Sequence, residues 1–215
     1  MSEMIIGSVP LLMAFTAAVI GRKKQRTYWL LLFPWFLLYT FVNQWIGFFM
    51  WPLFHVENQL LFNVFMLIEK GFYFYVFYSI LRKHVFKKIA VGAGTAFLLC
   101  YIYDVVIINK LFTYGYYAAN AGNLALVICG LLFFTEILIS EDYVDIFSLP
   151  MFWIATGIIV FAVGVLFYLC FFSYIINDVD KDGKIWRILA TILSVIEYSF
   201  FTVGFTLKHK WVHSK

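Results

Sequence analysis

The stretch NQLLFNVFMLIEKGFYFYVFY runs from Asn58 to Tyr78 and is apolar along most of its length, with one acidic and one basic residue side by side at Glu69 and Lys70. A helix needs roughly 20 apolar residues to cross the hydrocarbon core of a bilayer, which is the length of this stretch. An ionised side chain in hydrocarbon is costly unless it faces the interior of a helix bundle. The stretch therefore predicts a membrane-spanning helix whose buried face carries charge.

The composition of the whole chain agrees with this reading. Of its 215 residues, 64% are hydrophobic and 13% are charged, whereas an average soluble domain has about 25% charged residues. The net charge of +4 comes from short basic clusters between apolar runs. Such clusters indicate anionic lipid headgroups rather than nucleic acid as the partner. The chain is predicted to have the lipid bilayer as its main solvent.

The apolar runs predict an all-α, polytopic fold in which residues 1–215 form a single transmembrane domain. About seven spans are expected, and their ends are less certain than their existence. The predicted spans cover residues 4–21, 28–50, 58–81, 87–108, 116–139, 147–176 and 186–208.

Lysine and arginine residues are distributed unequally between alternate loops. Eleven fall on one side of the predicted spans: Arg22, Lys23, Lys24, Arg26, Arg82, Lys83, Lys87, Lys88, Lys208, Lys210 and Lys215. Four fall on the other: Lys110, Lys181, Lys184 and Arg187. Because the basic side stays in the cytoplasm, the N-terminus is predicted outside and the C-terminus inside.

Charged residues are predicted to share one level near the middle of the membrane. Glu69 and Lys70 lie midway along the third span, and Glu197 lies midway along the seventh. We expect Lys70 to pair with Glu197, because adjacent helical positions diverge by about 100° and Glu69 should point elsewhere. Glu69 would then be protonated or would meet Tyr73 one turn later. This level is either a structural latch between helices or a site for ligands or protons.

A second polar group is predicted nearer the outer face, on spans two to five. Its members are Asn43, Gln44, Asn63, Asp104, Asn120 and Asn123. Asn63 and Lys70 are two helical turns apart on one face, which would connect the two levels. The two levels together predict a ligand pocket open to the outside. Its aromatic walls would come from Tyr73, Tyr101, Tyr103, Tyr116, Tyr117 and Trp45. The alternative is that the asparagines only form hydrogen bonds between helices.

The predicted loop between the last two spans contains alternating carboxylates, Asp178, Asp180 and Asp182, followed by Gly183. This D-x-D-x-D-G pattern is typical of the start of a calcium-binding loop. The twelfth position is Leu189 where a bidentate glutamate is required, so a full EF-hand is excluded. The loop is either a weak Ca²⁺ site or a solvated acidic turn.

Several activities lack the residues that they need. The last span has no lysine near its middle, so retinal is not expected as a cofactor. The histidines lie at span ends or in the tail, which disfavours an intramembrane metal centre. No G-x-S-x-G motif is present. We therefore expect a protein that is not an enzyme, with lipid modification as the catalytic alternative.

Two apolar segments, the Asn58–Tyr78 stretch and SLPMFWIATGIIVFAVGVLF from Ser148 to Phe167, resemble parts of uncharacterised bacterial seven-helix membrane proteins. The resemblance would extend over most of the chain. It implies the topology and a kinship with sensory membrane modules that lack an output domain of their own. It implies no catalytic residues.

Three functions are compatible with these patterns. The first is a membrane sensor that recognises a small or lipid-like molecule from the outer side and signals to a cytoplasmic partner. The second is an ion- or proton-coupled transporter or channel, with Glu69 as a proton relay. The third is a structural membrane subunit. The charge bias and the absence of processing signals favour a bacterial inner membrane.

Overall fold

The computed structural model describes residues 2–22, 28–55, 57–140, 145–171 and 183–207, and all regular structure within these ranges is helical. The helices are α1 (Ser2–Arg22), α2 (Tyr28–Phe54), α3 (Gln59–Ile80), α4 (His84–Tyr101), η1 (Ile102–Ile108), α5 (Tyr116–Ile139), η2 (Ile146–Ser148), α6 (Pro150–Cys170) and α8 (Lys184–Thr206). The segment η1 is a π-helix that continues α4, and η2 is a short 3₁₀ helix.

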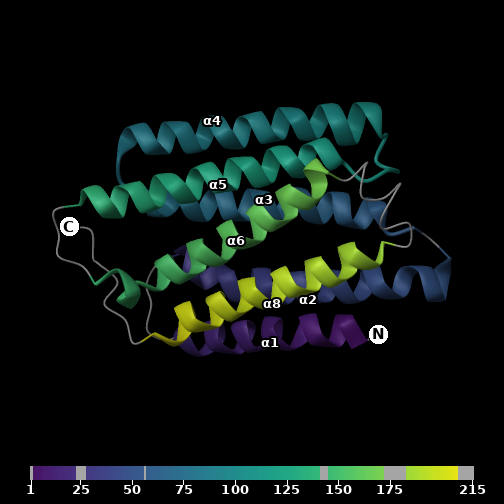
Figure 1. The fold of residues 1–215 in the computed structure, drawn as a ribbon, viewed down its shortest axis with the longest axis horizontal. Helices are drawn as coiled ribbons and strands as arrows, with labels where there is room; N and C mark the ends of the chain where they lie inside the picture. Colours follow the sequence, from purple (N-terminus) through teal and green to yellow (C-terminus); the bar gives the residue numbers. More distant parts are fainter. Residues whose placement is uncertain (1, 23–27, 56, 141–144, 172–182, 208–215) are drawn as a thin grey trace.

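The long helices lie side by side in one elongated bundle (Figure 1). Their contacts follow a ring in the order α1, α8, α6, α5, α4, α3, α2 and back to α1, and α3 also contacts α5. Helices α3, α5 and α8 run in the same direction, whereas α2, α4 and α6 run in the opposite one (Figure 1). Residues far apart in the sequence therefore meet at one depth of the bundle.

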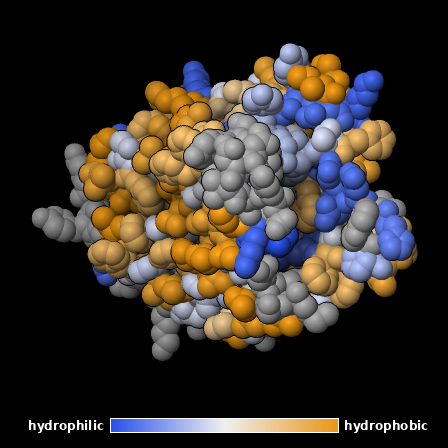
Figure 2. Space-filling model, turned by 45° about the vertical axis from the view of Figure 1, so that its right-hand side comes forward, coloured by the Kyte–Doolittle hydropathy of each residue, from blue (hydrophilic) through white to orange (hydrophobic). Residues whose placement is uncertain are grey.

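Six helices are long and apolar enough to cross a membrane: Trp29–Met50, Gln59–Ile80, His84–Ile108, Tyr116–Ile139, Pro150–Cys170 and Lys184–Thr206. A seventh, shorter apolar helix covers Ile5–Gly21. Many large apolar side chains remain exposed on the bundle, and hydrophobic residues cover much of the face shown in Figure 2. A monomer in water rarely exposes so much apolar surface. The bundle fits a multi-pass membrane protein.

Most helices begin and end within a few residues of the predicted spans. Helix α5 has the predicted bounds of 116–139. Helix α6 begins at Pro150, three residues after the predicted start, because 146–148 forms the separate turn η2. The span predicted at 87–108 begins earlier, at His84, and changes to π-helical geometry after Tyr101.

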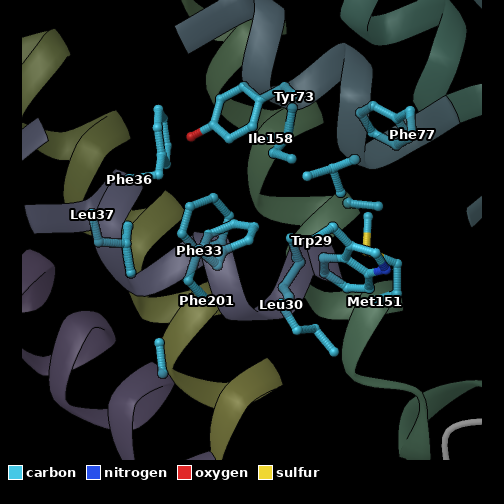
Figure 3. Packing of buried hydrophobic residues seen from close by; sticks show 14 of the residues in the cluster. Trp29, Leu30, Phe33, Phe36, Leu37, Tyr73, Phe77, Met151, Ile158 and Phe201 are labelled. Atoms are coloured by element: carbon cyan, nitrogen blue, oxygen red, sulfur yellow. The ribbon is translucent and has the colours of Figure 1, made fainter. Parts of the chain in front are cut away.

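Several aromatic rings pack together with aliphatic side chains in a buried cluster of the bundle (Figure 3). Phe33 of α2 lies at the centre, with its ring centroid 5.2 Å from that of Phe72 and 5.3 Å from that of Phe201. Tyr73 of α3 belongs to the same cluster, and its ring lies 5.3 Å from that of Phe36. Edge-to-face contacts of this kind fix the rotations of α2, α3 and α8 about their axes. They thereby fix the direction of the Tyr73 hydroxyl.

Glycines allow α6 and α8 to approach closely. A Cβ atom at Gly157 would lie 3.0 Å from the backbone oxygen of Glu197, and one at Gly204 would lie 2.8 Å from that of Pro150. Small residues serve this purpose in membrane bundles because lipid gives apolar side chains no net drive to associate. The close approach brings the backbone of Glu197 against α6 and keeps its side chain inside the bundle.

A carboxylate near the end of α5 binds the turn between α3 and α4. Glu136, near the end of α5, accepts hydrogen bonds from the backbone N–H groups of Arg82 and Lys83 at distances of 2.6 to 3.0 Å. These N–H groups lie at the start of α4, where a helix has no acceptors of its own. The structure gives Glu136 a defined role in holding the α3–α4 turn to α5.

Candidate functional site

The buried face of α3 is a stripe at spacings of three and four residues: Asn63, Met66, Lys70, Tyr73 and Phe77. This spacing places all five on one side of a helix. The predicted shared face of Asn63 and Lys70 is thus confirmed by burial. Only 3% of the Lys70 residue surface is exposed, which takes its ammonium out of contact with lipid. The stripe carries charge into the interior at mid-helix.

Lys70 pairs with Glu69, and the prediction that it pairs with Glu197 was wrong. Its Nζ lies 3.0 Å from Oε2 of Glu69, and no other ion pair is seen among the described residues. Although neighbouring Cβ atoms on a helix diverge by about 100°, the long stems of lysine and glutamate can bend back toward each other. The Lys70 stem is held against α5, where a Cβ at Gly122 would lie 3.2 Å from its Cγ. Its ammonium lies 6.0 Å from the Phe161 ring centroid.

Glu197 lies across the bundle from this pair and is 1% exposed. Its Oε1 accepts a hydrogen bond of 3.0 Å from the hydroxyl of Tyr73. No cationic side chain of the described residues lies within 4.0 Å of its carboxylate. The charges of Glu69 and Lys70 are close enough to act on it through space. The predicted contact between Glu69 and Tyr73 is therefore replaced by a bond from Tyr73 to Glu197.

Side chains of α2 and α5 complete this level. The side chain of Gln44 lies close to that of Tyr198, which brings α2 near α8 beside Glu197. Asn43 and Asn123 are both buried, with 4% and 1% exposure. We define the central polar layer as the residues Asn43, Glu69, Lys70, Tyr73, Asn123 and Glu197. The sequence predicted Glu69, Lys70 and Glu197 at one level in the middle of the membrane. The structure adds Asn43 and Asn123, which were expected nearer the outer face.

The asparagines of the layer are incompletely bonded. The buried side-chain oxygens of Asn43, Asn120 and Asn123 accept no hydrogen bond from the described residues. Buried polar atoms in folded proteins are nearly always satisfied, because each unsatisfied one costs about 1–3 kcal/mol. Asn120 itself is only partly buried. Hydrogen bonds between helices therefore do not explain why the side-chain oxygens of these asparagines are buried.

The remaining outer residues hold a loop and do not line a pocket. Asn63 donates from Nδ2 to the backbone oxygens of Thr113 (2.9 Å) and Leu111 (3.4 Å) and accepts from the N–H of Gly115 (3.2 Å). The hydroxyl of Tyr101 donates to the backbone oxygen of Asn63. Every side-chain donor and acceptor that Asn63 offers in the structure points at the segment 109–115. The prediction that Asn63 faces a ligand is replaced by this loop-anchoring role.

Asp104 has a similar role. It lies in the π-helix η1, is 1% exposed, and accepts from the backbone N–H of Ala118 and from Nδ2 of Asn109, both at 2.8 Å. Ala118 lies in the first turn of α5, which has no side-chain cap from its own N-cap residue Gly115. Asp104 therefore caps α5 from another helix, with its negative charge at the positive end of the helix dipole.

Replacing Asp104 with Leu is expected to lower the free energy of unfolding by about 1–2 kcal/mol, because the first turn of α5 loses its cap. Asp104→Asn should lose less, since its amide oxygen can still accept from Ala118. Thermal unfolding of the two variants in mild detergent measures the difference. Equal stability of Asp104→Leu and the wild type would contradict the capping role.

The anchored segment lies over the central polar layer. Tyr114 is close enough to Glu69 to sense its charge, and its ring packs against that of Tyr116 at a centroid distance of 5.2 Å. Burial, together with the charge of Glu69, raises the pKa of the Tyr114 hydroxyl well above its ordinary value. Tyr114 thus remains a neutral hydrogen-bonding group above the layer. The aromatic walls predicted from Tyr103 and Tyr117 are absent, because both side chains are exposed on the outside of the bundle.

The proposed calcium ligands Asp178, Asp180 and Asp182 lie outside the described residues, so the weak Ca²⁺ site stays a prediction. Within the described ranges, no group of three or more His, Cys, Asp and Glu side chains converges as a metal centre would require.

Comparisons with protein-family models, curated proteins and solved structures found no match to the chain. The resemblance to bacterial seven-helix proteins also stays a prediction.

Proposed function

We propose that this chain is a membrane sensor that binds a small ligand in the central polar layer and passes the signal to a cytoplasmic partner. One observation carries the proposal: a buried level of two carboxylates, one ammonium and two asparagines is drawn from α2, α3, α5 and α8 and is only partly satisfied. Ionisable and polar groups at membrane depth are expensive and typically mark functional sites.

The same layer supplies a means of transmission. A ligand that bonds to Asn43, Asn123 or Glu197 would favour one relative position of the helices that carry them, and a ligand shifts an equilibrium only through such differential contacts. The proposal includes seven spans, with α1 also crossing the membrane, an outer N-terminus and a bacterial inner membrane. The basic clusters and the apolar surface of α1 support these assignments.

The segment 109–115 lies between the layer and the predicted outer side. A ligand that enters from outside would pass this segment, which Asn63 and Asp104 hold through side-chain bonds. Lys110 and Leu111 both have positive φ angles, 46° and 69°. Such angles cost non-glycine residues about 1 kcal/mol or more each. Release of the segment would relieve this strain and offset part of the cost of opening.

Native mass spectrometry of the protein in mild detergent tests the proposal. We expect a retained non-detergent mass in the wild type that is lost in Asn123→Leu. Thr135→Val, which removes a polar group on the exposed face of α5, is the matched control and should retain the mass. Retention of the mass in Asn123→Leu would contradict binding at the layer.

A second candidate is cation- or proton-coupled transport, which the surplus of carboxylates over ammonium groups in the layer favours. A flux assay in proteoliposomes separates the two functions. Flux that is abolished by Glu69→Gln would favour transport, whereas ligand binding without flux would favour sensing. A protein without ligand or flux would leave the role of a structural subunit.

A further inference from the structure

The charges of the central polar layer do not balance when all three groups are ionised. Glu69 and Lys70 offset each other at 3.0 Å, which leaves the carboxylate of Glu197. Its one recorded partner, the hydroxyl of Tyr73, is neutral. A buried carboxylate without a cation is strongly disfavoured in a medium of low dielectric constant. When all three groups are ionised, the layer therefore has one negative charge in excess, which either a proton on Glu197 or a bound cation would neutralise.

The incompletely bonded atoms beside this charge are oxygens as well. On α5, Asn123 lies seven residues before Gly130, so the two share a face. A Cβ at Gly130 would meet Ile159 of α6 and Phe77 of α3, which shows that this face turns toward the groove between α3 and α6. Phe161 and Lys70 lie in that groove at the depth of Asn123. Asn123 therefore lies on the face of α5 that turns toward Lys70 and the layer.

Asn43 approaches from α2 in the same way. It lies seven residues after Phe36, whose ring stacks on Phe72 of α3, and four residues before Gly47, which faces Phe62 of α3. These neighbours place Asn43 on the face of α2 that turns toward α3. Gln44, the next residue along α2, lies close to the side chain of Tyr198 on α8. Asn43 and Asn123, whose amide oxygens are unsatisfied, therefore lie on the faces of α2 and α5 that turn toward α3.

We propose that the layer binds a monovalent cation, either an alkali metal ion or the ammonium group of a small amine, between the Glu197 carboxylate and the amide oxygens of Asn43 and Asn123. The inference rests on the proposed function, because it names the ligand class of the same site. Carboxylate and amide oxygens are hard ligands that suit cations of this kind. An ionised Glu197 would repel anions, and a neutral ligand would require Glu197 to keep a proton.

The aromatic neighbours are consistent with a cation. Phe161 already lies 6.0 Å from the Lys70 ammonium. Ring faces attract cations, and more strongly where water is excluded. Glu197, Asn43 and Asn123 provide a single carboxylate and two amides, too few anionic ligands to favour a divalent ion.

Thermal unfolding in mild detergent at constant ionic strength tests the proposal, with NaCl, KCl and ethylammonium chloride exchanged in turn for N-methyl-D-glucamine chloride. We expect a saturable rise in the midpoint with at least one of the three salts. A rise with NaCl or KCl would identify an alkali ion, and a rise with ethylammonium alone would identify an amine. Absence of a saturable rise with all three between pH 6 and 9 would overturn the proposal.

Glu197→Gln should abolish the rise, and Glu57→Gln, which removes an exposed acid, should keep it. If Glu197→Gln does not fold, Asn123→Leu serves instead and should weaken the apparent affinity about tenfold, roughly the loss of one ion–dipole contact. Equal rises in the wild type and in the variants would overturn the site. A retained neutral ligand without any cation effect would overturn this inference and leave the sensor proposal standing.

Discussion

Replacing Lys70 with Met is expected to lower the free energy of unfolding by about 3–5 kcal/mol, the range found when one partner of a buried ion pair is removed. Lys70 offsets Glu69 directly at 3.0 Å and acts through space on Glu197. Without the ammonium, the carboxylates of Glu69 and Glu197 share the bundle interior. No other cationic side chain of the described residues lies within 4.0 Å of either. The change is measured by thermal or SDS-induced unfolding in mild detergent.

The double variant Lys70→Met with Glu69→Gln is expected to recover most of this loss, because the remaining carboxylate returns to the environment that it has in the wild type. The combination of Lys70→Met with Glu197→Gln should recover less if Glu69 is the true partner. Lys88→Met, which removes an exposed lysine from α4, should change stability by no more than about 0.5 kcal/mol. Equal losses in the single variant and in both double variants would contradict the pairing seen in the structure.

The helices were predictable because lipid requires long apolar runs. The bounds of α5 agree with the prediction since polar residues flank both of its ends, and those of α6 differ because the turn at 146–148 is itself apolar. The π-helical geometry of η1 has no comparable signal. Its last bond runs from the Asn109 N–H to the oxygen of Asp104, five residues back, and the Leu111 N–H of the following loop bonds to the oxygen of Val105.

Composition and depth along the helices indicated the residues of the site but not their partners. Glu69 and Lys70 were expected to diverge because backbone geometry is regular, whereas the flexible side chains decide the contact. Glu136 was overlooked, and Asp104 was assigned to a pocket, because each caps a helix other than its own. Such caps depend on the tertiary arrangement, which leaves no fixed spacing in the sequence.

Replacing Asn63 with Leu is expected to cost about 3 kcal/mol, because three side-chain hydrogen bonds are lost and the buried N–H of Gly115 is left without its acceptor. Among the described residues, no other hydrogen bond to the oxygens of Leu111 and Thr113 is seen. The strain of the positive φ angles at Lys110 and Leu111 is then offset by fewer hydrogen bonds. The segment 109–115 should open at a lower free energy than the rest of the bundle.

Limited trypsin digestion measures this local opening, because Lys110 is exposed and lies within the anchored segment. Asn63→Leu should be cut after Lys110 into fragments of residues 1–110 and 111–215 under conditions in which the wild type resists. Asn58→Leu is the matched control, since it loses a single bond, from Asn58 Nδ2 to the oxygen of Gly47. If Asn63 anchors the segment over the central polar layer, its variant should also exchange a bound ligand faster than the control. If Asn63→Leu resists cleavage after Lys110 as well as the wild type does, and its unfolding midpoint is unchanged, the segment is held by other contacts.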